Sequence, residues 1–170
     1  DFICGGDPVA GGCSFVPPPN LCEQPGGSLG GSKECSNSKL DMTLHGTGVL
    51  AGWDRPISLP VKFETHVGPR TPGAPVQSFA TNIFHLEGQI TGDPDFDLLR
   101  IRAGTDFNMP SPGHTTLTRQ GAPGSPFAVD SFFDVFYEIY FQGSATGHVP
   151  GRSGSTTGTI RMQTGSGVGC

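Results

Sequence analysis

The sequence predicts an all-β protein, an antiparallel β-sandwich of jelly-roll or Ig-like type with about seven or eight strands. The first observation behind this is residues 129–142, where every odd position from Phe133 to Phe141 is apolar and neither Gly nor Pro occurs. Successive side chains of a strand point to opposite faces, so this row lies on one face of a sheet. The second observation is that 27 Gly and 16 Pro separate short alternating apolar segments in a chain of 170 residues. We expect residues 129–142 to be the central strand.

The even positions of this central strand mix aromatic rings with polar groups. Phe132, Phe136 and Tyr140 share that face, and Trp53 is the single tryptophan of the chain. Rings on a sheet surface can stack on sugars or be buried against another protein. The four aromatic residues are therefore the predicted binding or assembly face, with carbohydrate as one possible partner.

The chain begins with a predicted extended arm, residues 1–38, that is rich in Cys, Gly and Pro. It holds Cys4, Cys13, Cys22 and Cys35, and the fifth cysteine, Cys170, ends a Gly-rich tail at residues 165–170. Disulfides are the expected constraint on such an arm, and four cysteines allow three pairings that the sequence leaves open. Zinc is the alternative, but these cysteines are spaced more widely than the ligands of common zinc sites.

The predicted β-sandwich domain covers residues 39–164 and starts with two alternating segments. Leu40, Met42 and Leu44 alternate with polar residues, which indicates a half-buried strand. A second strand is expected at residues 57–63. Pro60 lies within it and has no N–H to donate, so this strand is expected at an edge or with a bulge.

Further strands follow between Gly- and Pro-rich loops. In residues 82–90, Phe84, Leu86 and Ile90 are expected on one face. Apolar alternation then resumes at residues 99–103, a Thr-rich segment follows at 115–119, and residues 156–164 are expected to close the sheet. Loops are expected at residues 67–75, 104–114 and 143–154.

Two groups of residues are candidate metal ligands. Asp93, Asp95 and Asp97 alternate as in the start of a calcium loop, although the Gly and Glu expected later in such a loop are absent. A polar β-turn is the alternative. No cofactor is otherwise predicted.

Three histidines form the second candidate group. His45, His66 and His85 fall on polar faces of predicted strands, and Glu64 and Glu87 lie two residues from two of them. If these strands are neighbours, the side chains could bind a transition metal. Solvated surface histidines are the alternative.

No catalytic residue is predicted, and the chain is expected not to be an enzyme. No G-x-S-x-G elbow is predicted in the chain, and residues 151–156, which contain Ser153, do not fit that spacing. Neither a P-loop nor a dinucleotide fingerprint occurs. Glu138 has no identifiable partner for paired-carboxylate chemistry.

Composition and charge limit the classes of partner. The net charge is −5 and charged residues make up 15% of the chain, so no nucleic-acid partner is predicted. No apolar run is long enough to span a membrane. A first residue Asp1 suggests a processed chain, and five cysteines suggest an oxidising compartment, so we expect a secreted or cell-surface protein.

Three segments carry a resemblance to known sequences. Residues 94–117, 127–139 and 153–162 resemble segments of secreted, β-rich bacterial proteins of environmental genomes. The resemblance covers about residues 40–164 and implies a secreted bacterial β-rich protein. That group has no assigned activity, so no catalytic residue is implied.

The expected function is that of an extracellular structural subunit that assembles with copies of itself into a filament, sheath or surface layer. An odd number of cysteines leaves one available for a bond between subunits. Open sheet edges can accept a strand from a neighbour. The alternative is a monomeric secreted module that binds carbohydrate or another ligand.

Overall fold

The computed structural model describes residues 22–164, without the side chains of residues 22–24. Eight strands and two short 3₁₀ turns make up this part of the chain. They are β1 (Cys22–Pro25), β2 (Ser32–His45), η1 (Gly48–Leu50), β3 (Asp54–Val67), β4 (Val76–Thr91), β5 (Phe96–Ala103), η2 (Thr105–Phe107), β6 (Ser111–Arg119), β7 (Phe127–Gly143) and β8 (Ser153–Gln163). The predicted all-β class is confirmed.

Every strand pairing is antiparallel, as predicted, and all eight strands belong to one sheet. β1, β2, β3 and β4 follow one another across it, and β8 pairs with β7 at the far side. Between these, β4 and β7 each pair with both β5 and β6, which closes a four-stranded ring of pairings. The pairings do not divide the strands into two sheets, so the jelly-roll or Ig-like sandwich stays a prediction.

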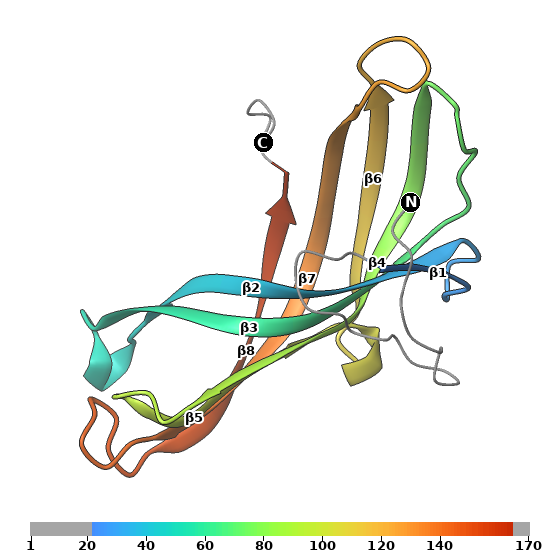
Figure 1. Ribbon diagram of the computed structural model, residues 1–170. Helices are drawn as coiled ribbons and strands as arrows, with labels where there is room; N and C mark the ends of the chain where they lie inside the picture. The colour runs from blue at the N-terminus through green and yellow to red at the C-terminus, as the bar shows by residue number, and fades with distance from the viewer. Residues whose placement is uncertain (1–21, 165–170) are drawn as a thin grey trace.

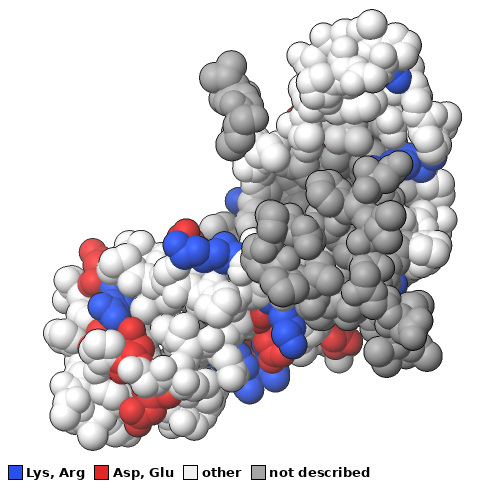
Figure 2. Space-filling model, in the orientation of Figure 1, with Lys and Arg blue, Asp and Glu red and all other residues white. Residues whose placement is uncertain are grey.

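β4 and β7 are long strands, and each pairs with β6 over one half of its length and with β5 over the other half. β6 pairs with the first half of both strands, and β5 pairs with the second half. In Figure 1, β4, β6 and β7 rise together as one part of the sheet, while β2, β3 and β5 belong to the lower part. Acidic and basic side chains intermingle on the lower part in Figure 2, and the top of the upper part is nearly free of charge.

The hydrophobic core lies on the inner face of the lower part. The apolar row of β7 faces it, with Val135 and Ile139 buried, because alternate residues of a strand share a face. Leu59 from β3, Ile83 from β4 and Leu99 from β5 are completely buried. This core gives the lower part the apolar interior beside which the candidate site lies.

One expectation about β4 is wrong in its detail, because Phe84 does not share the core face with Leu86. The register between β3 and β4 shifts at Glu64 and Thr65, which pair with His85 and Ile83 and leave Phe84 without a partner. An extra residue of this kind shifts the alternation by one position. Ile83 therefore enters the core instead, and the ring of Phe84 stacks on His66 with their centroids 4.2 Å apart.

The environment of Pro60 agrees with the expected edge. β3 pairs with β2 along nearly its whole length, but its pairing with β4 begins only at Val61. Pro60 therefore has one neighbouring strand in the sheet.

β2 runs without a break through Ser38 and Lys39, where the arm was expected to end. Cys35 on β2 is fully buried and disulfide-bonded, and Cys22 lies opposite it in the pairing of β1 with β2. Cys4, Cys13 and Cys170 lie outside the described residues. The pairing of the five cysteines, the arm and the tail stay predictions.

In residues 22–164, no helix has the length and hydropathy to cross a membrane.

Candidate functional site

Among the described strands, the outer edges of β2 and β8 are two that lack a full partner. β2 pairs with β3 on one side, while on the other side β1 covers only Ser32 to Cys35. β8 pairs with β7 and has no second neighbour among the described strands. Unpaired edges of this kind present N–H and C=O groups that can bind another strand.

An apolar cavity of about 550 Å³ lies between these two edges. Leu40, Met42 and Leu44 line it from β2, and Ile160 and Met162 line it from β8. Its remaining wall includes Leu86, Ile101, Ala103, Val135, Tyr137 and Ile139 from β4, β5 and β7. We call this feature the β2–β8 groove.

The β8 side of the groove has apolar side chains that face inward but remain exposed. Ile160 pairs with Val135, so both side chains point to the same face of the sheet. Val135 is 3% exposed, whereas Ile160 is 55% exposed and Met162 38%. The difference arises because Val135 lies inside the sheet and Ile160 lies on its last strand. A further strand beyond β8 would cover these side chains.

A second cluster lies where β3 passes the turn between β1 and β2. Ser28 Oγ is 2.8 Å from His66 Nδ1, and the backbone N–H of Ser28 donates to the same nitrogen at 3.0 Å. On the other side of the ring, His66 Nε2 is 2.8 Å from Glu64 Oε1. The side chains of His66 and Glu64 are buried, and Ser28 is exposed. The three side chains therefore form a Ser–His–Glu chain of hydrogen bonds.

Sequence reasoning misses this cluster because it treats residues 1–38 as an extended arm and predicts no G-x-S-x-G elbow, which is wrong as to spacing. Gly26, Ser28 and Gly30 nevertheless have the G-x-S-x-G spacing, which is the signal that could have singled out Ser28. His66 and Glu64 were selected as candidate metal ligands. Their position two residues apart on one strand places both side chains on one face.

The Asp triplet contributes to a third cluster. The buried carboxylate of Asp95 accepts hydrogen bonds from the backbone N–H of His148 at 3.0 Å and from its Nδ1 at 2.7 Å. These bonds hold the pKa of Asp95 below its ordinary value, and the nearby charge of Arg55 acts in the same direction. Arg55 also donates to Asp93 at 2.7 Å. Asp93 and Asp95 are thus engaged with cationic or N–H partners.

The three candidate metal-binding histidines are not brought together. His45 contacts Asp54 at 2.7 Å, His85 contacts Asp106 at 2.9 Å, and His66 contacts Glu64. Within residues 22–164, no group of three or more His, Cys, Asp or Glu side chains could hold a metal ion. The calcium and transition-metal sites stay predictions without geometric support from this region.

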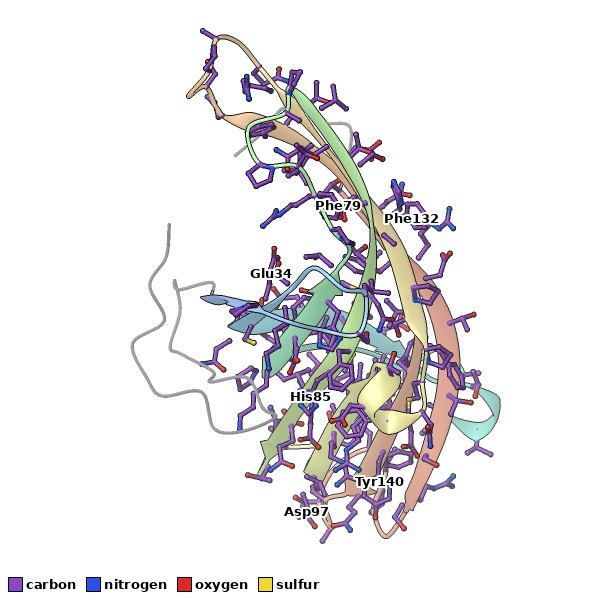
Figure 3. All side chains as sticks on the ribbon, turned by 90° about the vertical axis from the view of Figure 1, so that its right-hand side faces the viewer. Glu34, Phe79, His85, Asp97, Phe132 and Tyr140 are labelled. Carbon is purple, nitrogen blue, oxygen red and sulfur yellow. The ribbon has the colours of Figure 1, made fainter. Side chains whose placement is uncertain are left out.

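Of the four aromatic residues predicted to form a binding face, three share a face of the sheet. Phe132, Phe136 and Tyr140 alternate on β7 with its core row, and Figure 3 shows Phe132 on the opposite side of the curved sheet from Phe79. Arg161 lies 4.4 Å above the Phe132 ring and Arg100 lies 5.4 Å above the Tyr140 ring. Trp53 instead packs beside Phe96 at the core.

No family model, curated protein or solved structure matches this chain. What the chain does must therefore be argued from its own geometry. Two features of the described residues carry that argument, the apolar β2–β8 groove and the hydrogen-bonded cluster of Ser28, His66 and Glu64.

Proposed function

We propose that this protein is an extracellular structural subunit that assembles with copies of itself by strand addition. The β2–β8 groove of one copy accepts an extended segment of the next copy. In this proposal the two halves of the bent sheet act as the layers of a β-sandwich from which one strand is missing. The protein is secreted, and disulfides hold its N-terminal region.

The observation that carries the proposal is the exposure of Ile160 and Met162 on the inner face of β8. Exposing apolar surface to water costs free energy, roughly 25 cal/mol for each Å². An incoming strand would remove that cost and would also satisfy the backbone groups of both edges. A soluble sheet that needed no partner would be expected to carry charged or polar side chains there.

The occupant we propose is a strand from residues 9–16 of a second copy. These residues lie outside the part that the structure describes, so their role is argued from the sequence. Val9, Cys13 and Phe15 occupy alternate positions, with Gly11 between them, and would share one face of a strand. The tail at residues 165–170 is shorter, and Val168 is its single branched apolar residue. The arm is therefore the better donor.

The position at which the arm joins β1 favours insertion of the arm into a neighbouring copy over insertion into its own groove. The arm precedes β1, which lies on the groove side of β2. Pro17, Pro18 and Pro19 follow the donor segment and have no N–H to give to a strand ladder. They oppose a continuous extension of β1 along its own β2. In the proposal, residues 9–16 instead enter the groove of a neighbouring copy.

The directions of β2 and β8 are consistent with a head-to-tail contact between copies. Five successive antiparallel pairings lead from β2 through β3, β4, β5 and β7 to β8, so β2 and β8 run in opposite directions. A single inserted strand is therefore antiparallel to one edge and parallel to the other. Because arm and groove are different surfaces, each copy can give one strand and receive one, and such head-to-tail contacts build an open fibre.

Two neighbouring substitutions on β8 test the proposal. Ile160→Asp places a charge in the groove, whereas Thr159→Asp places the same charge on the outer face opposite Phe136. We expect Ile160→Asp to abolish assembly, as seen by sedimentation velocity and electron microscopy. We expect Thr159→Asp to assemble like the wild type. Circular dichroism of both variants checks that they are folded.

A wild-type protein that stays monomeric at all concentrations would overturn the proposal. That result would also be expected if the groove held a small apolar molecule or the arm of its own chain. The alternative of a carbohydrate-binding module has less support, because Arg161 and Arg100 already cover the rings of Phe132 and Tyr140.

A further inference from the structure

Ser28, His66 and Glu64 have the connections that nucleophilic catalysis needs, and they lie outside the groove residues. A serine becomes reactive when a base accepts its proton and a third group orients that base. Here Ser28 Oγ lies 2.8 Å from His66 Nδ1, and His66 Nε2 lies 2.8 Å from Glu64 Oε1. Both distances are those of direct hydrogen bonds.

The hydrogen bonds define which ring nitrogen can act as the base. The backbone N–H of Ser28 can only donate, so His66 Nδ1 must accept and carries no proton. Nε2 then carries the ring hydrogen and donates a hydrogen bond to the carboxylate of Glu64. The unprotonated nitrogen is therefore the one that faces the hydroxyl of Ser28.

The surroundings fix the ring and leave the hydroxyl accessible. The side chains of His66 and Glu64 are 6% and 8% exposed, and Phe84 stacks on the imidazole. Ser28 is exposed in a turn closed by a hydrogen bond from the N–H of Gly30 to the carbonyl of Gly27. The oriented base is thus buried while the nucleophile meets solvent.

A donor for a developing oxyanion is also present. The backbone N–H of Leu29 follows Ser28 directly and has no acceptor in the described part of the chain. In hydrolases with the G-x-S-x-G motif, the N–H after the nucleophile is one of the oxyanion donors. The turn here joins two strands instead of a strand and a helix, so the motif alone would carry little weight. The proposal is instead supported by the hydrogen bonds that join Ser28 to His66 and His66 to Glu64.

We propose that Ser28, His66 and Glu64 form an acyl-transfer site that hydrolyses carboxylic esters. Ser28 Oγ attacks the ester carbonyl while its proton passes to His66 Nδ1. The alcohol leaves with that proton, and an acyl–serine remains. Water then attacks this ester and gives a proton to His66 Nδ1, and Ser28 takes it back as the carboxylic acid departs. The net reaction is ester plus water to acid plus alcohol.

The test uses a fluorophosphonate probe on the full-length protein, with the labelled residue located by mass spectrometry. The chain supplies a matched control, because Ser78 Oγ lies 2.7 Å from His114 Nε2 but no carboxylate contacts His114 among the described residues. We expect Ser28 to be labelled at least tenfold faster than Ser78. Hydrolysis of p-nitrophenyl acetate is expected to fall to background in Ser28→Ala.

The thermal stability of Ser28→Ala and one further variant separate catalysis from folding. Ser28→Ala keeps the backbone N–H that donates to His66, so its thermal midpoint is expected to match that of the wild type. Glu64→Gln is expected to reduce labelling of Ser28 by about 100-fold, within the range for general base catalysis. Equal labelling of Ser28 and Ser78, or unchanged ester hydrolysis in folded Ser28→Ala, would overturn the site. Neither readout depends on assembly through the groove.

Discussion

The carboxylate of Asp95 and both N–H groups of His148 form one hydrogen-bonded unit, at 3.0 Å from the backbone nitrogen and 2.7 Å from Nδ1. The side chain of Asp95 is 7% exposed, and Arg55 Nε lies 3.4 Å from its second oxygen. Three segments distant in sequence therefore meet at one buried charge. This junction fixes the loop after β7 beside the start of β5.

The first prediction concerns acid stability at this junction. The pKa of Asp95 is lowered in the folded protein by its hydrogen bonds to His148. Its contribution to the free energy of unfolding is thus fully present above the ordinary pKa of 3.8, and it is lost as the pH falls through the lower, folded value. Asp95→Asn should cost about 1.5–3 kcal/mol at pH 7 and less at pH 2, measured by urea unfolding.

The control for this prediction is Asp97→Asn. Asp97 belongs to the same triplet, but its side chain is exposed and forms no ion pair within the described residues. We expect it to change the free energy of unfolding by less than about 0.5 kcal/mol at either pH. Equal effects at Asp95 and Asp97 would contradict the account of the buried unit.

The second prediction separates two isoleucines that both point inward. Ile83 is completely buried, whereas Ile160 is 55% exposed in the groove. Ile83→Ala should cost about 2–5 kcal/mol, because it removes packed methyl groups and leaves a cavity. Ile160→Ala should cost less than about 1 kcal/mol in the monomer. Urea unfolding at low protein concentration measures both, and similar losses would show that Ile160 is already covered.

The strands could be predicted because alternation is a local property of the sequence. The sites could not be predicted, because they depend on which strands pair with each other. The alternation of β7 identified Val135 and Ile139 as core residues. The bulge that puts Ile83 in the core and Phe84 outside it cannot be recognised from the local alternation, because it is set by the register of β4 with β3. Ser28 and His66 are 38 residues apart, and only the pairing of β1, β2 and β3 brings them together.

The third prediction concerns the loop that carries His148. A Cβ on Gly147 would lie 2.6 Å from Asp95 Cα and 2.7 Å from the carbonyl oxygen of Pro94. Both contacts are with backbone, so the loop must move and the hydrogen bonds of Asp95 weaken. Gly147→Ala should cost about 1–3 kcal/mol. Gly154→Ala is the control, because its Cβ would meet only Phe141 at 3.9 Å, and thermal unfolding compares the two.

The last prediction concerns the donor strand and rests on the proposed assembly. Phe15 and Ser14 are adjacent in the proposed donor segment, so they would face opposite sides of the inserted strand. Phe15→Asp should abolish assembly because it directs a charge into the apolar groove, and Ser14→Asp should leave assembly intact. Both are measured by sedimentation velocity on the full-length protein.

Mixing two defective variants tests the polarity of the contact. Phe15→Asp has an intact groove and a defective donor, whereas Ile160→Asp has an intact donor and a defective groove. Each alone should be monomeric. Together they should form a one-to-one dimer, because the arm of the second enters the groove of the first and neither remaining surface can extend the chain. Fibres in the mixture, or a mixture that stays monomeric while the wild type assembles, would show that arm and groove are not the two halves of the contact.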